Sequence, residues 1–322
     1  MAMKIKFWGT RGSIPTPAMP AARYSRIRAI LNAATPDDIA DSASVDAFVE
    51  GGCGGTLPTI YGGNTACVNV TNDDGTELMI DFGSGARELS GHIMATRGPV
   101  SKQPYHVLMS HLHWDHIMGF PFFVPAYVPG NVVHIYSCHQ GAEEAFRRQH
   151  GAPSFPVPFE VLGAEIHFHY LDPKEPAVIN GFHVRPHLLN HAGDAYAFRI
   201  RKGSGDFVYA SDGEHKPHLV SDEYPYVDFI RGTKLLVFDA QYSLAETVSV
   251  KEDWGHSSNF VGVELALLGG VEQLVFIHHE PLNTDEKLDE IVAEARQIER
   301  MMRENRPAVD VSAAFDGLEI EL

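Results

Sequence analysis

The stretch SHLHWDHIMGF, residues 110–120, places four potential metal ligands within six residues, directly after an apolar run. His111 and His113 are two residues apart, so on an extended segment both side chains point to one face. A turn at the intervening tryptophan would then direct Asp115 and His116 toward the same space. Imidazole nitrogens and carboxylate oxygens are the ligands that Zn²⁺ and similar ions prefer in catalytic sites. Four such groups exceed what one ion takes from so short a segment, so we predict two metal ions side by side.

HLHWDH also matches the HxHxDH signature of the metallo-β-lactamase superfamily, and later segments resemble further motifs of that superfamily in the same order. LLNHAGDAYAFRI resembles the third-histidine motif through His191, and YASDGE resembles the bridging-aspartate motif through Asp212. FIHHEP resembles the last-histidine motif. His278 fits that motif better than His279, because the family's histidine typically precedes a proline by three residues. The resemblance covers nearly the whole chain apart from residues 17–60.

The resemblance implies how these side chains are divided between the metals. One ion would be held by His111, His113 and His191, the other by Asp115, His116 and His278, and Asp212 would bridge them. Two cations about 3.5–4 Å apart lower the pKa of a bridging water and clamp the oxygens of a phosphoryl or acyl group.

Three details of this metal centre stay at the level of expectation. Asp115 could also orient the bridging water. Asp81, in LMIDFGSG, resembles the family's strand-end aspartate that hydrogen-bonds to a ligand histidine, although it could equally cap the glycine turn that follows. Zn²⁺, Mn²⁺ and Fe²⁺ all suit such a site, so the native metal is left open.

Another motif narrows the class of reaction that we expect at this site. WGHSSNF, which begins at Trp254, resembles the motif of the phosphodiesterase branch of the superfamily, which includes tRNase Z and phosphoribosyl 1,2-cyclic phosphate phosphodiesterase. The resemblance implies that His256 lies near the scissile phosphate as a general acid, paired with an acidic residue at a preceding strand end. Asp239 in KLLVFDAQY occupies that place, although the ribonucleases usually carry Glu there. A carboxylate partner would orient the imidazole and favour its protonated form.

The rest of the chain predicts a mixed α/β (α+β) protein. Short strands and helices alternate without a linker, which indicates one domain with layered sheets over residues 1–322. The resemblance implies a four-layer αββα sandwich with the metals at one sheet edge. Residues 17–60 read as a helical insertion or lid, with one helix over 22–34, a second over 35–50 that starts at a Thr cap and a Pro, and GGCGG (51–55) as a hinge.

Three other features have two readings each. The aromatic, Pro-rich stretch 120–130 suits a pocket wall or plain packing. Arg23, Arg26 and Arg28 could contact a substrate anion or lie on a solvated helix face. Asn64, in a segment that resembles an N-terminal motif of the phosphodiesterase branch, could reach the pocket or serve a turn.

Charge and composition limit the partners. Acidic residues outnumber basic ones by 42 to 25, giving a net charge of −17, so a long nucleic acid would be repelled over most of the surface. A small anionic phosphodiester remains a suitable substrate if metal cations dominate one pocket. No apolar stretch is long enough to cross a bilayer, and the three cysteines form no disulfide framework, so we expect a cytoplasmic protein without membrane contact.

The expected function is therefore a dinuclear metal-dependent phosphodiesterase that acts on a small, linear or cyclic, phosphodiester. Three alternatives stay open: a lactone, lactam or thioester hydrolase on the same metals, a tRNase Z-like ribonuclease, and a non-catalytic metal-stabilised sensor. The oligomeric state is also open, with a homodimer among the options.

Overall fold

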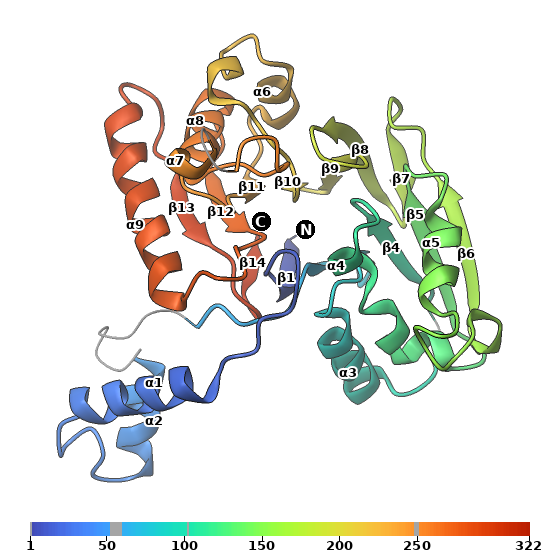
Figure 1. The fold of residues 1–322 in the computed structure, drawn as a ribbon, viewed down its shortest axis with the longest axis horizontal. Helices are drawn as coiled ribbons and strands as arrows, with labels where there is room; N and C mark the ends of the chain where they lie inside the picture. The colour runs from blue at the N-terminus through green and yellow to red at the C-terminus, as the bar shows by residue number, and fades with distance from the viewer. Residues whose placement is uncertain (1, 52–59, 102, 248–250) are drawn as a thin grey trace.

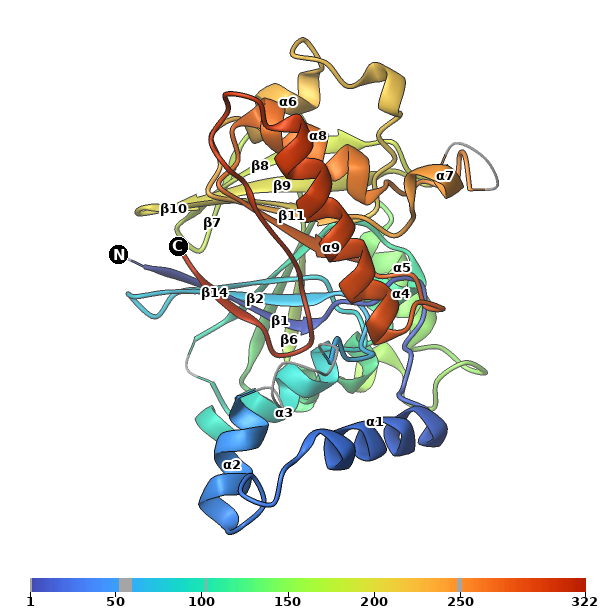
Figure 2. The same ribbon diagram turned by 90° about the vertical axis from the view of Figure 1, so that its left-hand side faces the viewer.

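The core of the protein consists of two β-sheets of seven strands each, packed face to face (Figures 1 and 2). The computed structural model describes residues 2–51, 60–101, 103–247 and 251–322. In spatial order, the first sheet contains β14 (Glu319–Glu321), β1 (Met3–Gly9), β2 (Cys67–Asn72), β3 (Glu77–Ile80), β4 (Tyr105–Met109), β5 (Val132–Ser137) and β6 (Glu165–Tyr170). The second contains β13 (Asp310–Ala313), β12 (Gln273–Ile277), β11 (Leu235–Asp239), β10 (Gly205–Ala210), β9 (Ala195–Lys202), β8 (Phe182–Leu189) and β7 (Ala177–Ile179).

Helices cover the outer face of each sheet, which completes four layers. Those on the side of the first sheet are α3 (Ala86–Arg97), α4 (Trp114–Ile117) and α5 (Ala142–Gln149). Those on the side of the second are α6 (Pro225–Ile230), α7 (Leu244–Thr247), α8 (Asn259–Gly269) and α9 (Asp285–Met302). Figure 2 shows the two sheets one above the other, with α3 below them and α6 and α8 above. The predicted four-layer αββα sandwich is confirmed.

Three apolar clusters hold these layers together. One lies between the sheets and includes Phe7, Phe198 and Ile277, while the other two lie between each sheet and its own helices. β11 is buried at all five positions, as expected of a parallel strand covered on both faces. Because the site described below follows the ends of these buried strands, the core fixes the positions from which its side chains project.

The insertion lies apart from the sandwich (Figure 1). Its helices, α1 (Pro20–Ala33) and α2 (Ser42–Glu50), contain no buried residue, and Arg26 forms an ion pair of 3.4 Å with Asp285 at the start of α9. Arg23 and Arg28 lie on the exposed surface of α1. Whether this insertion acts as a lid stays a prediction.

The predicted helix over 35–50 is wrong in its first half. The Asp38 carboxylate accepts hydrogen bonds from the Thr35 N–H at 2.8 Å and from the Thr35 hydroxyl at 2.7 Å, which forms a local turn. The helix begins only at Ser42, where Asp41 is the N-cap and accepts from the Ser44 N–H. Of the predicted hinge at 51–55, residues 52–55 lie outside the described residues.

Buried histidines should make the fold sensitive to acid. Burial lowers the pKa of His215 to about 3, and lowers those of the less buried His106 and His187 to about 4. In the unfolded chain these groups titrate near pH 6.5, roughly, so below that pH the unfolded state binds more protons. Stability should therefore fall as the pH decreases from about 6.5 toward 4, with His215 contributing up to about 1.4 kcal/mol per pH unit.

Urea unfolding in the presence of EDTA at several pH values in this window tests that expectation. His215→Gln should reduce the dependence of the free energy of unfolding on pH by about 1 kcal/mol per unit. Equal slopes for the variant and the unmodified protein would show that His215 does not carry this linkage.

Candidate active site and metal centre

The predicted site residues gather where strands of both sheets end. Asp81 follows β3 and His111 closely follows β4, while Asp212 follows β10, Asp239 ends β11 and His278 follows β12. β3 and β4 are parallel, and so are β10, β11 and β12, so within each sheet these ends share one edge. Asp81, Asp212 and His278 have φ values of 60°, 60° and 63°, a region that residues other than glycine seldom adopt. Such conformations persist where the surroundings over-determine them, and they cluster at functional sites.

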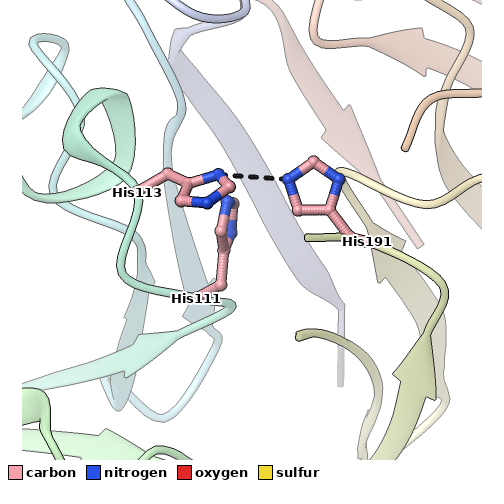
Figure 3. Close-up of side chains that lie close together, drawn as sticks. All are labelled: His111, His113 and His191. Carbon is pink, nitrogen blue, oxygen red and sulfur yellow. Dashed lines mark hydrogen bonds between the residues drawn. The ribbon is translucent and has the colours of Figure 1, made fainter. Parts of the chain in front are cut away.

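Three histidines form one ligand group. The ligand atoms of His111, His113 and His191 lie within 4.8 Å of one another, and Figure 3 shows the rings converging. Nε2 of His191 is 3.1 Å from Nδ1 of His113. Nδ1 of His191 lies 2.9 Å from the carbonyl oxygen of Gly255, which leaves Nε2 for the cluster. His113 is exposed whereas His111 is buried, so the group opens to solvent on the side of His113.

A second group consists of Asp115, His116 and His278, all buried, with ligand atoms within 4.8 Å of one another. The Asp115 Oδ2 atom lies 3.1 Å from Nε2 of His278 and 3.4 Å from Nε2 of His116. The same oxygen accepts a hydrogen bond from the backbone N–H of Ser13 at 2.8 Å. Sequence reasoning missed Ser13, because a backbone donor in a distant loop leaves no residue-type signal.

The two adjacent histidines after β12 point in different directions. Nε2 of His278 faces the Asp115 carboxylate, whereas Nε2 of His279 lies 2.8 Å from the Ala314 carbonyl oxygen, away from the cluster. Gly12 packs directly against the His278 ring, where a Cβ atom would lie 2.5 Å from Nδ1. The geometry thus favours His278 over His279 as the ligand, and it requires glycine at position 12.

Asp212 lies between the two groups. Its Oδ1 atom is 3.8 Å from Nε2 of His111 and 3.7 Å from Nε2 of His191. On the other side it is 3.2 Å from Nε2 of His278, and Oδ2 is 3.1 Å from Nε2 of His116. One carboxylate therefore contacts members of both groups, which is the arrangement that a bridging ligand needs.

These residues fit divalent metal ions. Nε2 of His111 and Nε2 of His116 are buried, and neither makes a well-directed hydrogen bond among the described residues although Asp212 oxygens lie 3.8 Å and 3.1 Å away, which is unusual for buried polar atoms. Burial lowers the pKa of His111. At His116 and His278 the nearby carboxylates of Asp212 and Asp115 outweigh the effect of burial. They raise the pKa of His116 well above its usual value and the pKa of His278 to about 9. The carboxylates therefore favour positive charge in this space, and metal cations would satisfy the same field.

Asp81 supports the cluster from behind. Its Oδ2 atom lies 2.8 Å from Nδ1 of His116, which leaves Nε2 of that ring for the metal side. The Asp81 carboxylate also accepts from the N–H and the hydroxyl of Ser110 and from the hydroxyl of Tyr209. A carboxylate behind a metal-binding histidine fixes both its tautomer and its orientation.

His256 lies beside the metal groups and pairs with Asp239. Nδ1 of His256 is 2.7 Å from Oδ2 of Asp239, and both residues are buried. The imidazole ring stacks on that of His278, with centroids 5.0 Å apart, and one of its nitrogens lies within 4.8 Å of the ligand atoms of His191 and Asp212. The loop of His256 ends two residues later, where the Ser258 hydroxyl caps α8. The structure thus places the predicted pair next to both candidate metal positions.

Two other candidates are not part of the cluster. In the stretch 120–130, Phe120 and Phe123 are fully buried beneath the first sheet, so they serve core packing rather than a pocket wall. The Phe122 side chain, by contrast, is 54% exposed. The side-chain oxygen of Asn64 accepts from the Ser84 hydroxyl, and its carbonyl oxygen accepts from two backbone N–H groups of the N-terminal loop, which is a turn role.

No helix in the described part of the chain is long and apolar enough to span a membrane.

Comparisons with known proteins show the family and the fold. A family model described as "Beta-lactamase superfamily domain" matches residues 78–279, more than half of the chain. The uncharacterized protein Rv1339 of Mycobacterium tuberculosis is 27% identical over 228 residues, which cover 68% of this chain and 74% of that protein. The fold is similar to that of the metallo-β-lactamase fold protein YhfI from Bacillus subtilis, with a TM-score of 0.64 at 16% identity and full coverage of both chains. It is also similar to a diphosphatase from the PhnP family, with a TM-score of 0.61 at 18% identity over 99% of this chain and 98% of that one. The chain belongs to the β-lactamase superfamily and has the metallo-β-lactamase fold.

Proposed function

We propose that this protein is a dinuclear metal-dependent phosphodiesterase that acts on a small phosphodiester, linear or cyclic. The observation that carries the proposal is the buried pair of His256 and Asp239, 2.7 Å apart, beside two groups of metal-ligating side chains. The two groups alone account for metal-dependent hydrolysis in general. The pair adds a proton donor for the departing oxygen of a phosphodiester, in the place where the phosphodiesterase branch carries one.

In this proposal His111, His113 and His191 would hold one ion and Asp115, His116 and His278 the other, with Asp212 as a ligand shared by the two groups. When bound, such ions lower the pKa of a water molecule and neutralise the charge on the phosphoryl oxygens. Zn²⁺, Mn²⁺ and Fe²⁺ are all compatible with these ligands.

Two residues of the chain would supply the proton that the leaving oxygen needs. Asp239 accepts from Nδ1–H of His256, so the proton available to the substrate is the one that the other ring nitrogen carries in the imidazolium form. As the bond between phosphorus and the leaving oxygen breaks, His256 would donate that proton to the oxygen. The position of His256 supports this role, because its ring stacks on that of His278 and one of its nitrogens lies within 4.8 Å of an Asp212 oxygen.

Charge argues for a small substrate. With a net charge of −17, the chain would repel a long polyanion outside the metal centre. The structurally similar PhnP-family protein is described as a diphosphatase, which is consistent with a reaction at phosphorus.

A substrate panel tests the proposed class. Protein loaded with Zn²⁺ or Mn²⁺ should hydrolyse bis(p-nitrophenyl) phosphate with a kcat/KM at least about 100-fold above that for p-nitrophenyl acetate, a lactone or a β-lactam. Faster turnover of the lactone or the lactam would assign the site to carbon–oxygen or carbon–nitrogen bonds. Preferential cleavage of precursor tRNA would point to the ribonuclease, and no turnover of any substrate would favour a sensor.

A further inference from the structure

A short segment, residues 253–256, connects the two halves of the candidate site. The carbonyl oxygen of Gly255 accepts a hydrogen bond of 2.9 Å from Nδ1 of His191, and the next residue is His256. The position of this segment therefore decides both how the His191 ring is oriented and where the His256 ring lies. Something must hold the segment in place.

Glu214 makes the contacts that hold it. Its Oε1 atom accepts from the backbone N–H of Asp253 and its Oε2 atom from the N–H of Gly255, each at 3.1 Å. The Glu214 residue is only 5% exposed. Its own backbone N–H donates to the carbonyl oxygen of Asn190 at 3.0 Å, so it is also tied to the residue before His191.

The local backbone explains why a carboxylate is needed there. Asp253 and Gly255 both have positive φ values, 64° and 83°, and the N–H groups of both point at the same side chain. Backbone N–H groups that converge on one point in this way form a concave site for an anion. Gly255 cannot be replaced by a larger residue, because a Cβ atom would lie 2.3 Å from Nδ1 of His191.

Lys216 balances the buried charge. Its Nζ atom lies 2.6 Å from Oε1 of Glu214 and 2.8 Å from the Asp253 carboxylate. The carboxylate thus has a counter-ion and two backbone donors, which together use both of its oxygens. A glutamine of the same shape offers only one acceptor oxygen and would turn an NH₂ group toward one of the two N–H groups.

We propose that Glu214 is a positioning residue of the metal centre. Its buried carboxylate holds segment 253–256 so that Gly255 keeps Nε2 of His191 turned toward the cluster and His256 stays beside it. The part that concerns His256 rests on the proposed phosphodiesterase function, whereas the part that concerns His191 requires only that the site binds metal.

Zinc binding by Glu214→Gln tests the proposal without relying on catalysis. Competition with a chelator should show two zinc ions in the unmodified protein, and in the variant one of them should bind about 10–100-fold more weakly while the other is unchanged. In the same samples, kcat for bis(p-nitrophenyl) phosphate should fall by more than KM changes. Glu252→Gln is the matched control, because this 55% exposed side chain also pairs with Lys216, at 3.5 Å, but in the described part of the chain it accepts no hydrogen bond from the backbone of segment 253–256. The control should behave like the unmodified protein.

Each outcome decides the question. Unchanged zinc affinities in Glu214→Gln would overturn the proposal, and so would equal losses in both variants, since these would reflect charge rather than position. If Glu214→Gln does not fold, Glu214→Asp keeps the charge but shortens the reach by one methylene, and unchanged zinc affinities there would overturn the proposal as well. If the unmodified protein turns over no phosphodiester while Glu214→Gln still loses zinc affinity, the proposed function fails and the positioning role of Glu214 stands.

Discussion

His256→Ala should lower kcat for an alkyl phosphodiester by about 10²–10⁴-fold, which is the usual contribution of a positioned general acid. The reason is the geometry of the pair: Asp239 holds Nδ1 of His256 at 2.7 Å, and a ring nitrogen of His256 lies within 4.8 Å of ligand atoms of His191 and Asp212. His256 is not a member of either set of three proposed ligands, so the metal content should remain at two ions. Steady-state kinetics and elemental analysis of the same sample measure both quantities.

The leaving group gives this prediction a sharper form. A substrate whose departing oxygen is a weak base needs little protonation, so the loss in His256→Ala should be smallest for p-nitrophenyl esters and larger for alkyl phosphodiesters. His183→Ala, which removes an exposed histidine from β8, serves as the control and should change neither kinetics nor metal content. Full activity of His256→Ala on both kinds of substrate would remove His256 from the mechanism.

Asp212→Asn should have the second large effect, on metal binding itself. The Asp212 carboxylate lies 3.1–3.2 Å from Nε2 of His116 and of His278, and its Oδ1 atom also faces His111 and His191. Removing its charge takes one negative ligand from both ions at once. We expect the protein to keep at most one ion after dialysis, with an affinity loss of at least about 100-fold, more than for a residue behind the ligands.

Elemental analysis after dialysis against a chelating resin, together with turnover of bis(p-nitrophenyl) phosphate, checks this expectation. Asp228→Asn removes the same charge from an exposed ion pair with Arg231 and should leave both quantities unchanged. Retention of two tightly bound ions by Asp212→Asn would show that this carboxylate does not bridge them.

The start of the candidate site is a local signal in the sequence, and the resemblance that this signal carries implied the four-layer fold. The metal-ligating side chains of residues 111–116 are nearly contiguous, and a strand that ends in a polar residue places that residue at the sheet edge, as at Asp81 and Asp239. The later histidines carried little information alone, and their order along the chain made them recognisable. The choice of His278 over His279 came from spacing to a proline, and the structure turns His279 away toward Ala314.

The features that sequence reasoning missed depend on backbone groups far away in the chain. Ser13 donates its N–H to Asp115 across 102 positions, and Glu214 accepts from Gly255 across 41. Neither contact requires a particular donor side chain, so neither leaves a pattern in composition or spacing. The start of α2 was misplaced for another reason: Thr35 and Asp38 form a turn of their own, and Asp41 is a second cap that competes with the first.

We expect two metal ions to bind side by side at the edge of both sheets, with His256 close to the phosphoryl group of the substrate. Anomalous diffraction from crystals of Mn²⁺-loaded protein soaked in phosphate measures this directly. We predict two manganese peaks, one among His111, His113 and His191 and one among Asp115, His116 and His278, with a phosphate oxygen within hydrogen-bond reach of His256. A single manganese peak, or a phosphate bound away from His256, would contradict the account.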